Sequence, residues 1–288
     1  MKRIIITVTT ILFLSLVLTL GVGSQAPAVS FADETQAETF LYLPLVYRRW
    51  TPPAACPVGV HLSAETASLL VTYRQEPGTV LAFTYRQAES VFPELGAWQR
   101  VIVQPSLEGL RTLAQRAAEN GMPYEALLYT PDRRPATPQE EWQNLVAASQ
   151  TARDIANQYG KRLILAPGIT LMAENTELYP AMAALADGWF IDASIFQNTS
   201  PPGDQYRWDV STVVDRLHQG NEKITIWVQI ALDPQAPDPD NWLAYWNSLR
   251  GLVAAADIAT NFKTAEDPGA LLIALQTLMQ HTCTPSAP

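Results

Sequence analysis

The sequence is short of cysteine, histidine and basic residues, and each shortage excludes a class of function. It has 2 Cys and 3 His among 288 residues, and the scattered His61, His218 and His281 give no zinc-type ligand spacing. Lys and Arg together number 19 against 28 Asp and Glu, which gives a net charge of −9. Because electrostatic binding to nucleic acid needs a basic surface, this composition argues against a nucleic-acid partner.

Several sequence motifs of enzyme families are also missing. There is no Gly-x-Ser-x-Gly elbow, no His-Glu-x-x-His metal motif, no Walker phosphate loop and no Gly-x-Gly-x-x-Gly loop. We therefore expect no metal, no nucleotide and no other cofactor. What the chain does have is a globular composition, with 48% hydrophobic and 16% charged residues, which is enough to build a buried core.

The amino terminus has the layout of a secretory signal peptide. Lys2 and Arg3 precede an uncharged, mainly apolar run over 4–22, and small and polar residues follow. We interpret residues 1–32 as the signal and the protein as secreted or extracytoplasmic, with possible cleavage after Ala26, Ser30 or Ala32. Since the run is long enough to cross a bilayer, an uncleaved signal anchor is the alternative, and it is the one membrane contact expected.

Residues 33–55 have the composition of a linker, and residues 56–288 that of one globular domain. The linker has an acidic start, an apolar patch over 41–46 and two prolines near its end, without helical or strand periodicity. The patch has two interpretations. It is either a strand laid on the domain or a segment like those that follow the signal peptide in some secreted bacterial proteins.

The two cysteines, Cys56 and Cys283, lie close to the two ends of the globular domain. In an exported protein such a pair is expected to form a disulfide. A bridge that closes so long a loop contributes up to roughly 5 kcal/mol in the chain-entropy model. Two free thiols are the alternative.

Eight short apolar runs of strand length alternate with amphipathic segments. The runs cover 58–62, 79–85, 100–104, 124–130, 162–167, 188–193, 223–231 and 255–261. This alternation predicts an α/β fold, a single-domain (β/α)8 TIM-type barrel of about 230 residues. A doubly wound open sheet is the rival fold. The barrel is favoured because it brings Cys56 and Cys283 to the same amino-terminal face.

Capping residues mark the expected ends of the helices. An Asp, Ser or Thr stands at each expected start, at Ser106, Thr137, Asp209, Asp240 and Asp267. Glycine stands just after the expected ends of three helices, at Gly121, Gly160 and Gly220.

A barrel places its functional residues at the carboxyl ends of its strands. Polar residues inside the apolar strand runs are expected to face the barrel interior, where together they line one pocket for a small-molecule or carbohydrate ligand. Trp227 would form part of the floor. The polar candidates are His61, Gln104, Tyr129, Gln229 and Asn261.

Asp192 is the first catalytic candidate, because an ionised carboxylate at the end of a buried strand needs either partners or a chemical role. Glycoside hydrolysis needs a second acid. Asp132 and Asp233 follow the fourth and seventh strand runs and are the candidates for that role. The alternative for each of the three is structural: a carboxylate that accepts N–H groups of its own loop or takes part in an ordinary turn.

The stretch after the sixth strand run, 197–209, is long for a barrel connection and carries aromatic residues. An exposed Tyr206 or Trp208 would offer a flat apolar face for stacking on a sugar ring. The alternative for Trp208 is that it covers the rim of the barrel.

Three segments carry a family resemblance: Leu127-Leu128-Tyr129-Thr130-Pro131-Asp132, Pro135-Ala136-Thr137-Pro138-Gln139-Glu140 and Leu165-Ala166-Pro167-Gly168. Over roughly residues 57–282 the chain resembles uncharacterised secreted bacterial barrel proteins, which are distantly similar to glycoside-hydrolase barrels. The resemblance implies the fold and export. Classical two-glutamate barrels carry Glu after strands four and seven, where this chain has Asp132 and Asp233, so no catalytic residue is carried over.

Three hypotheses for function follow from these patterns. The first is a secreted carbohydrate-active hydrolase that uses Asp192 with Asp132 or Asp233. The second is a non-catalytic barrel that binds a sugar or another small molecule. The third is a surface or assembly protein in which the apolar patch over 41–46 docks elsewhere.

Overall fold

A computed structural model describes residues 58–62, 81–84, 100–233 and 236–259, together with 270, 273–274 and 277–278. The predicted signal peptide, the linker, both cysteines and Asn261 lie outside these residues. Within the described part, no helix is both long and apolar enough to cross a membrane.

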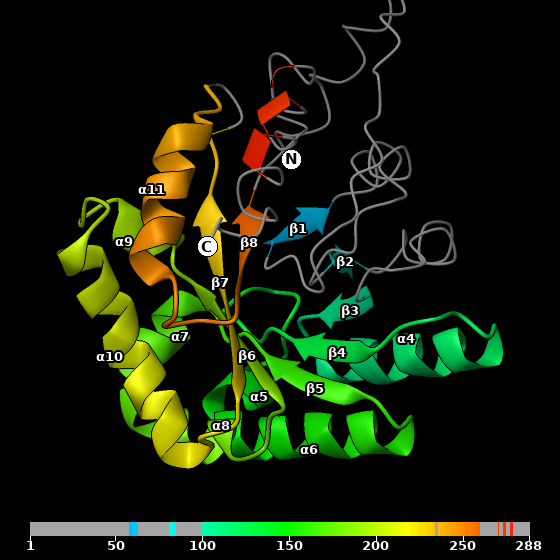
Figure 1. Cartoon of the computed structure of the whole chain (residues 1–288). Coiled ribbons are helices and arrows are strands. Elements are labelled where there is room, and N and C mark those ends of the chain that lie inside the picture. Colours follow the sequence, from blue (N-terminus) through cyan, green and yellow to red (C-terminus); the bar gives the residue numbers. More distant parts are fainter. Residues whose placement is uncertain are drawn as a thin grey trace, which may run out of the picture. The chain divides into compact units, whose positions relative to one another are not determined.

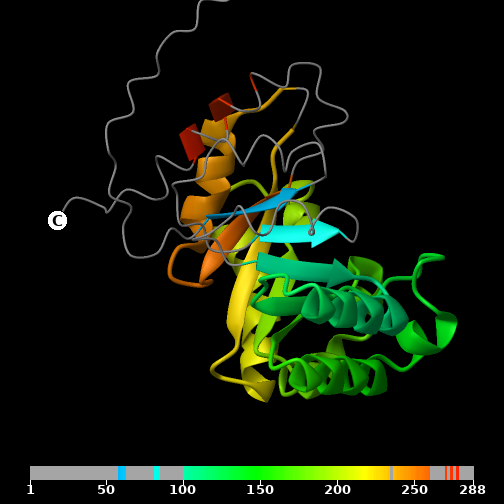
Figure 2. The same cartoon turned by 90° about the vertical axis from the view of Figure 1, so that its right-hand side faces the viewer.

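Eight parallel strands form a closed barrel in which each strand pairs with its neighbours in sequence and β8 pairs with β1 (Figures 1 and 2). The predicted (β/α)8 barrel is therefore confirmed and the open sheet is wrong. Each strand lies within two residues of its predicted bounds. The strands are β1 (Val58–Leu62), β2 (Leu81–Thr84), β3 (Arg100–Gln104), β4 (Ala126–Tyr129), β5 (Arg162–Leu165), β6 (Gly188–Asp192), β7 (Thr225–Ala231) and β8 (Ala255–Ala259).

Helices follow each strand from β3 to β7 and cover the outside of the sheet, where α6 packs between α4 and α8, and α10 between α8 and α11 (Figure 1). The connection after β5 accommodates Pro180 in the first turn of a short helix, α8. The helices are α4 (Leu107–Glu119), α5 (Gln139–Gln143), α6 (Leu145–Gln158), α7 (Ile169–Glu174), α8 (Tyr179–Ala183), α9 (Ser194–Gln197), α10 (Asp204–Gly220) and α11 (Pro239–Leu249).

The capping predictions are confirmed at one helix and corrected at others. Ser106 caps α4, since its hydroxyl accepts the N–H of Gly109. α11 begins earlier than predicted because the carboxylate of Asp238, not Asp240, accepts the first free N–H groups. α10 likewise begins at Asp204, which places Asp209 inside the helix.

The helix predicted from Thr137 to Gly160 is divided into α5 and α6 at Asn144. Thr137 does not cap it. The Thr137 hydroxyl instead accepts the N–H of Asp132 and donates to the carbonyl of Pro105, and so links two loops at the carboxyl end of the barrel.

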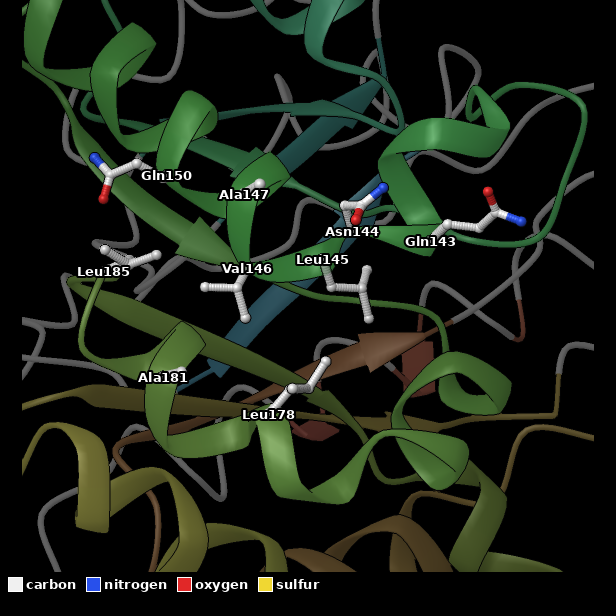
Figure 3. A pocket seen from close by; sticks show the side chains of 9 residues that line it. All are labelled: Gln143, Asn144, Leu145, Val146, Ala147, Gln150, Leu178, Ala181 and Leu185. Atoms are coloured by element: carbon white, nitrogen blue, oxygen red, sulfur yellow. The ribbon is translucent and has the colours of Figure 1, made fainter.

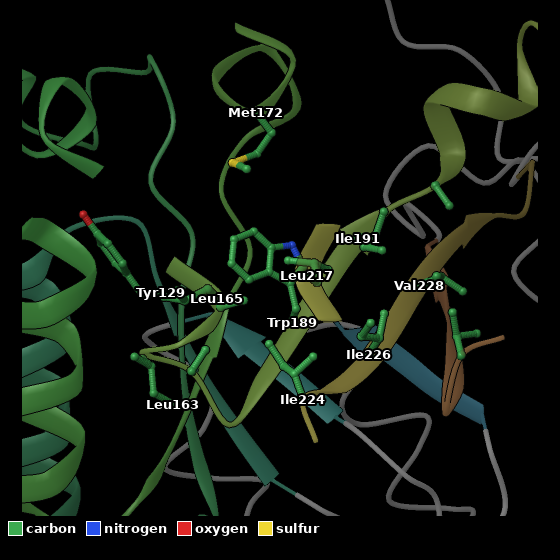
Figure 4. Close-up of a cluster of buried hydrophobic side chains, with 14 of the residues drawn as sticks. Tyr129, Leu163, Leu165, Met172, Trp189, Ile191, Leu217, Ile224, Ile226 and Val228 are labelled. Carbon is green, nitrogen blue, oxygen red and sulfur yellow. The ribbon is translucent and has the colours of Figure 1, made fainter. Parts of the chain in front are cut away.

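Side chains alternate between two apolar layers along the strands, as the two-residue period of a strand requires. Figure 4 shows the outer layer, where Trp189, Leu163 and Leu165 lie between the strands and the helices. The inner layer fills the barrel. Its buried members are Val101, Val103, Ala126, Leu128, Ile164, Phe190 and Trp227.

Gly188 is required by the inner layer. A Cβ at this position would overlap the six-membered ring of Trp227, which lies across the start of β6 and close to Ile164. The absence of a side chain on one strand therefore makes room for the largest side chain on the next.

Ion pairs close the amino-terminal end of the described strands. Arg100 at the start of β3 pairs with Glu125, and Arg153 of α6 pairs with Asp187, whose carboxylate also accepts the N–H of Leu163. These four charged groups are paired within the protein, and the active sites of TIM barrels lie at the opposite, carboxyl end of the strands.

Candidate functional site

Four inner-face positions form one row across neighbouring strands at the carboxyl end of the barrel. Tyr129 is in register with Leu165, and Leu165 with Trp189. The β4 to β5 ladder continues past the strands, since the N–H of Gly168 donates to the carbonyl of Pro131 at 2.8 Å. Register-paired residues of parallel strands share a face. Extended by three residues past Tyr129, Leu165 and Trp189, the same offsets bring Asp132, Gly168, Asp192 and Gln229 to one level, and we call this set the rim row.

Asp192 ends β6 and is half-buried. Its Oδ1 accepts the N–H of Ser194 at 3.2 Å and also the Ser194 hydroxyl. Its Oδ2 has no hydrogen-bond partner in the described part of the chain. The carboxylate is therefore oriented by one oxygen and has the other available. Its charge contributes to the raised pKa of the nearby Tyr206, which is due first to burial and then to Tyr245.

Asp132 lies against Gly168. A Cβ added to Gly168 would overlap Oδ1 of Asp132, so the carboxylate occupies the space that the glycine leaves. Oδ1 also accepts the N–H of Arg133 at 2.8 Å, and Oδ2 pairs with Nε of Arg134 at 2.6 Å. The Asp132 side chain is 22% exposed, so the carboxylate is open to solvent at this end of the barrel.

The floor below the rim row is aromatic. Phe190 and Trp227 are in register with each other, two residues before Asp192 and Gln229. The indole N–H of Trp227 is buried and has no hydrogen-bond partner among the described residues. Gln229 is half-buried, and its amide makes no hydrogen bond there either. The sequence prediction for Trp227 and Gln229 is consistent with these positions, since both lie on the inner face.

The loop after β4 is tied to α7 by charge. Arg133 pairs with Glu174, and its guanidinium lies 5.2 Å from the centre of the Trp142 ring. Arg134 is the more exposed arginine, with 80% of its side chain accessible. Neither arginine nor Ser194 was predicted as a site residue. The tripeptides Asp132-Arg133-Arg134 and Asp192-Ala193-Ser194 nevertheless contain a recognisable pattern, because each acid is followed within two residues by the groups that bind its carboxylate.

Gln104 and Tyr129 do not line the barrel interior, so this prediction is wrong for them. Each follows an inner-face residue by one position and therefore faces the helices. Gln104 packs against Gly109 of α4. The Tyr129 hydroxyl donates to Oε2 of Glu141 at 2.8 Å, and burial together with this bond raises the pKa of Tyr129 above its ordinary value of 10.0.

The aromatic residues after β6 lie in a helix and not in a loop. Tyr206 is fully buried in α10, where its ring meets Tyr245 edge-on and its hydroxyl donates to the carbonyl of Ala193. A sugar has no access to this ring, so its predicted role in stacking is wrong. Trp208, also on α10, is 64% exposed, and a stacking role for it stays a prediction.

The remaining candidates lie away from the rim row or outside the described side chains. Asp233 is exposed and stands two residues beyond the end of β7. His61 lies in β1 at the position paired with Ala82, but its side chain is outside the described part. Among the described residues no three His, Cys, Asp or Glu side chains are arranged to hold a metal ion.

A separate groove of about 610 Å³ lies on the outside of the barrel between α6 and α8 (Figure 3). It is mainly apolar and contains none of the predicted site residues. Its lining residues are Gln143, Asn144, Leu145, Val146, Ala147, Gln150, Leu178, Ala181 and Leu185.

No family model matches the chain, and no curated protein matches it in sequence. It is similar in structure to 3-keto-L-gulonate-6-phosphate decarboxylase from Vibrio cholerae, with a TM-score of 0.47 and 11% identity over 82% of this chain and 100% of that chain. It is also similar to an endo-β-N-acetylglucosaminidase from Cordyceps militaris in its apo form, with a TM-score of 0.49 and 9% identity over 83% and 93% of the two chains. These structural neighbours are TIM-barrel enzymes.

Proposed function

We infer that the protein is a carbohydrate-active barrel that hydrolyses glycosidic bonds with the two acids of its rim row, Asp132 and Asp192. One observation carries the proposal. The carboxylate of Asp132 lies where a side chain on Gly168 would be, and Gly168 is the position between Asp132 and Asp192 when the register of β5 with β4 and β6 is extended by three residues.

The spacing of the strands suits this reaction. Neighbouring strands lie about 4.8 Å apart, so positions two strands apart are roughly 10 Å from each other at the backbone. Since Asp132 leans over Gly168, its carboxylate is nearer to β6 than its backbone is. Glycosidases hold their two carboxyl groups about 5 to 10 Å apart, one to protonate the leaving oxygen and one to attack or to activate water.

The hydrogen-bond partners suggest a division of roles. Asp132 is held by the Arg134 guanidinium and a backbone N–H, which suits a carboxylate that acts as nucleophile or base. Asp192 has one oxygen fixed by Ser194 and the other available to a substrate. It is accordingly assigned as the general acid, and Gln229 beside it as a donor or acceptor for sugar hydroxyls.

The test is a hydrolysis screen against aryl glycosides and polysaccharides, followed by Asp192→Asn and Asp132→Asn. Each variant should lower kcat by about 10²- to 10⁴-fold without changing the midpoint of thermal unfolding. Asp215→Asn, an exposed acid on α10, is the matched control and should keep full activity. Equal activity of Asp192→Asn and the wild type would overturn the proposal.

A non-catalytic sugar-binding barrel is the second candidate. The observation that favours it is that both acids accept an N–H of their own loop, from Arg133 and from Ser194, as structural caps do. This candidate predicts saturable binding without turnover, lost in Asp192→Asn. Absence of both binding and turnover would leave the surface or assembly hypothesis.

Export belongs to the same proposal, since extracellular carbohydrates are the substrates that such a protein would meet. The signal-like segment over 1–32 supports it. Expression of the full chain with N-terminal sequencing of protein from the medium should give a start after Ala26, Ser30 or Ala32. Retention of Met1 on membrane-bound protein would instead favour the signal anchor.

A further inference from the structure

A buried phenol contacts the turn that follows Asp192. Tyr206 of α10 and Ala193 are both fully buried, and the Tyr206 hydroxyl donates to the Ala193 carbonyl at 3.3 Å. Ala193 comes directly after Asp192 at the end of β6 and directly before α9. Inside the protein, the hydroxyl therefore holds the backbone one residue beyond the proposed general acid.

One peptide group connects this phenol to the carboxylate of Asp192. The carbonyl of Ala193 and the N–H of Ser194 belong to the same planar peptide unit. The carbonyl accepts the Tyr206 hydroxyl, and the N–H donates to Oδ1 of Asp192 at 3.2 Å. Because a planar unit turns as a whole, the bond from Tyr206 limits how far the N–H of Ser194 can turn. A hydrogen bond at the carbonyl also polarises the peptide and strengthens its N–H as a donor.

The electrostatics of Tyr206 agree with this connection. Burial is the largest cause that raises the pKa of Tyr206, followed by Tyr245 and then by the negative charge of Asp192. The phenol therefore keeps its proton at neutral pH and remains a donor to the Ala193 carbonyl. The influence of the Asp192 charge on Tyr206 means that the two side chains lie close to each other.

The ring of Tyr206 is itself fixed in position by a second tyrosine. It meets the Tyr245 ring edge-on, with the ring centroids 4.7 Å apart. The Tyr245 hydroxyl lies 3.4 Å from the carbonyls of both Gln197 and Ser200, farther along the segment that follows β6. The two buried phenols therefore hold the same segment, but it is Tyr206 that contacts the peptide next to Asp192.

We propose that Tyr206 is a positioning residue for the general acid and acts on Asp192 through the peptide between Ala193 and Ser194. The inference rests on the proposed function of the same site. Because Tyr206 is fully buried, it neither touches the substrate nor supplies a proton to the reaction. It keeps Oδ1 of Asp192 in place, while Oδ2 gives its proton to the glycosidic oxygen as the bond from that oxygen to the sugar breaks.

The experiment compares two substrates of the full-length protein that differ in their need for an acid. A disaccharide loses a poor leaving group that must be protonated, whereas dinitrophenolate leaves the same sugar without a proton. Tyr206→Phe keeps the ring and removes the hydroxyl alone. This change should lower kcat/KM for the disaccharide about fivefold to tenfold, because the acid is misplaced, and should leave kcat/KM for the dinitrophenyl glycoside within about twofold.

Tyr245→Phe is the matched control, because it removes the hydroxyl of the adjoining buried tyrosine and keeps its ring. Both kcat/KM values should stay within about twofold of the wild type. Thermal unfolding of the two variants shows whether they lose similar stability. An equal fall for both substrates in Tyr206→Phe, or the same selective fall in Tyr245→Phe, overturns the inference, since a general loss of structure does not distinguish the leaving groups.

The outcomes separate this inference from the proposed function. If Asp192→Asn loses cleavage of the disaccharide selectively and Tyr206→Phe does not, the proposed function stands and the role of Tyr206 fails. If the wild type cleaves no glycoside, both fail.

A second variant covers the case in which Tyr206→Phe does not fold. Tyr206→4-aminophenylalanine keeps a donor at this position, but an aromatic amine donates more weakly than a phenol. A selective fall of kcat/KM for the disaccharide is expected, and an unchanged ratio between the two substrates overturns the inference.

Discussion

Polar residues occur on both faces of the barrel sheet, but their hydrogen bonds differ between the two faces. On the outer face, the Tyr129 hydroxyl donates to Glu141, and the carboxylate of Glu141 also accepts the N–H of Leu107 at 3.0 Å. On the inner face, Oδ2 of Asp192 and the amide of Gln229 have no hydrogen bond within the described chain. The polar groups on the outer face therefore make their hydrogen bonds within the protein, whereas Asp192 and Gln229 on the inner face can still form hydrogen bonds with a ligand.

Structural and functional polar residues of a barrel differ in how many of their hydrogen bonds are made within the protein. A buried polar group whose bonds are all made within the protein joins elements together. Here Glu141 links α5 to β4 and to the first turn of α4. A polar group at the strand ends is a candidate for ligand binding when one of its oxygen or nitrogen atoms has no hydrogen-bond partner within the protein. The following changes test that separation.

The largest expected effect is on stability, from Glu141→Ala. Removing the buried carboxylate leaves the Tyr129 hydroxyl and the Leu107 N–H without an acceptor, which should lower the free energy of unfolding by about 3 kcal/mol. Urea unfolding measures this change. Glu140→Ala, one residue away and exposed, is the control and should stay within about 0.5 kcal/mol of the wild type.

A smaller effect, on function, is expected from Gly168→Ala. The new methyl group overlaps Oδ1 of Asp132 and must push the carboxylate out of the rim row. Activity or sugar affinity should fall about tenfold or more, because misplacing a positioned group is costly. The methyl group also overlaps Cγ of Asp132, so the whole of this short side chain must turn. Because the Asp132 side chain is partly exposed, stability should fall less than it does after an overlap inside the barrel.

Gly188→Ala is the matched substitution for that experiment. Its methyl group overlaps the ring of Trp227 inside the barrel, so it should lower stability by about 1 to 3 kcal/mol through overpacking. If Gly168→Ala lowers stability as much as Gly188→Ala does, the distinction between rim and core is wrong.

The smallest expected effect is from Tyr129→Phe, which removes one buried hydrogen bond and should cost about 1 kcal/mol near neutral pH. It should also change the dependence of stability on alkaline pH. The pKa of Tyr129 is raised in the folded protein, so its contribution is fully present below pH 10 and is lost as pH rises above 10. Stability of the variant should therefore fall less steeply above pH 10 than stability of the wild type.

Tyr124 offers a second test of this pH dependence, since burial raises the pKa of Tyr124 to about 12. Tyr124→Phe should also flatten the loss of stability between pH 10 and 12. If neither variant alters the slope of unfolding free energy against pH, the buried phenols do not control alkaline stability.

The strands were predictable because each is a short apolar run, and a run buried on both faces needs no knowledge of its neighbours. The start of α4 was predictable for a similar reason, since Ser106 caps the helix through a bond to Gly109, three residues away. The starts of α10 and α11 were less so. α10 begins after Gly203 without a side-chain cap, so no residue type marks its start. Before α11 the sequence offers both Asp238 and Asp240, and only the backbone geometry selects Asp238.

The inner or outer position of a polar residue was not predictable from its being embedded in a strand. Gln104 and Tyr129 were expected inside the barrel with Asp192 and Gln229, but they are one residue out of phase with the inner layer. Tyr206 was mistaken for a loop residue because prolines precede it, although α10 begins at Asp204 and buries it.

The number and order of the strands, the barrel class and the acids Asp132 and Asp192 could be predicted, because they depend on local apolar runs and on residue identity. Which polar residues share a face, and which acids share a row, could be seen only in the folded protein. Those depend on register between strands far apart in sequence, such as Asp192 beside Gln229 and Asp132 above Gly168. A shift of one residue in any strand would have turned every side chain to the other face.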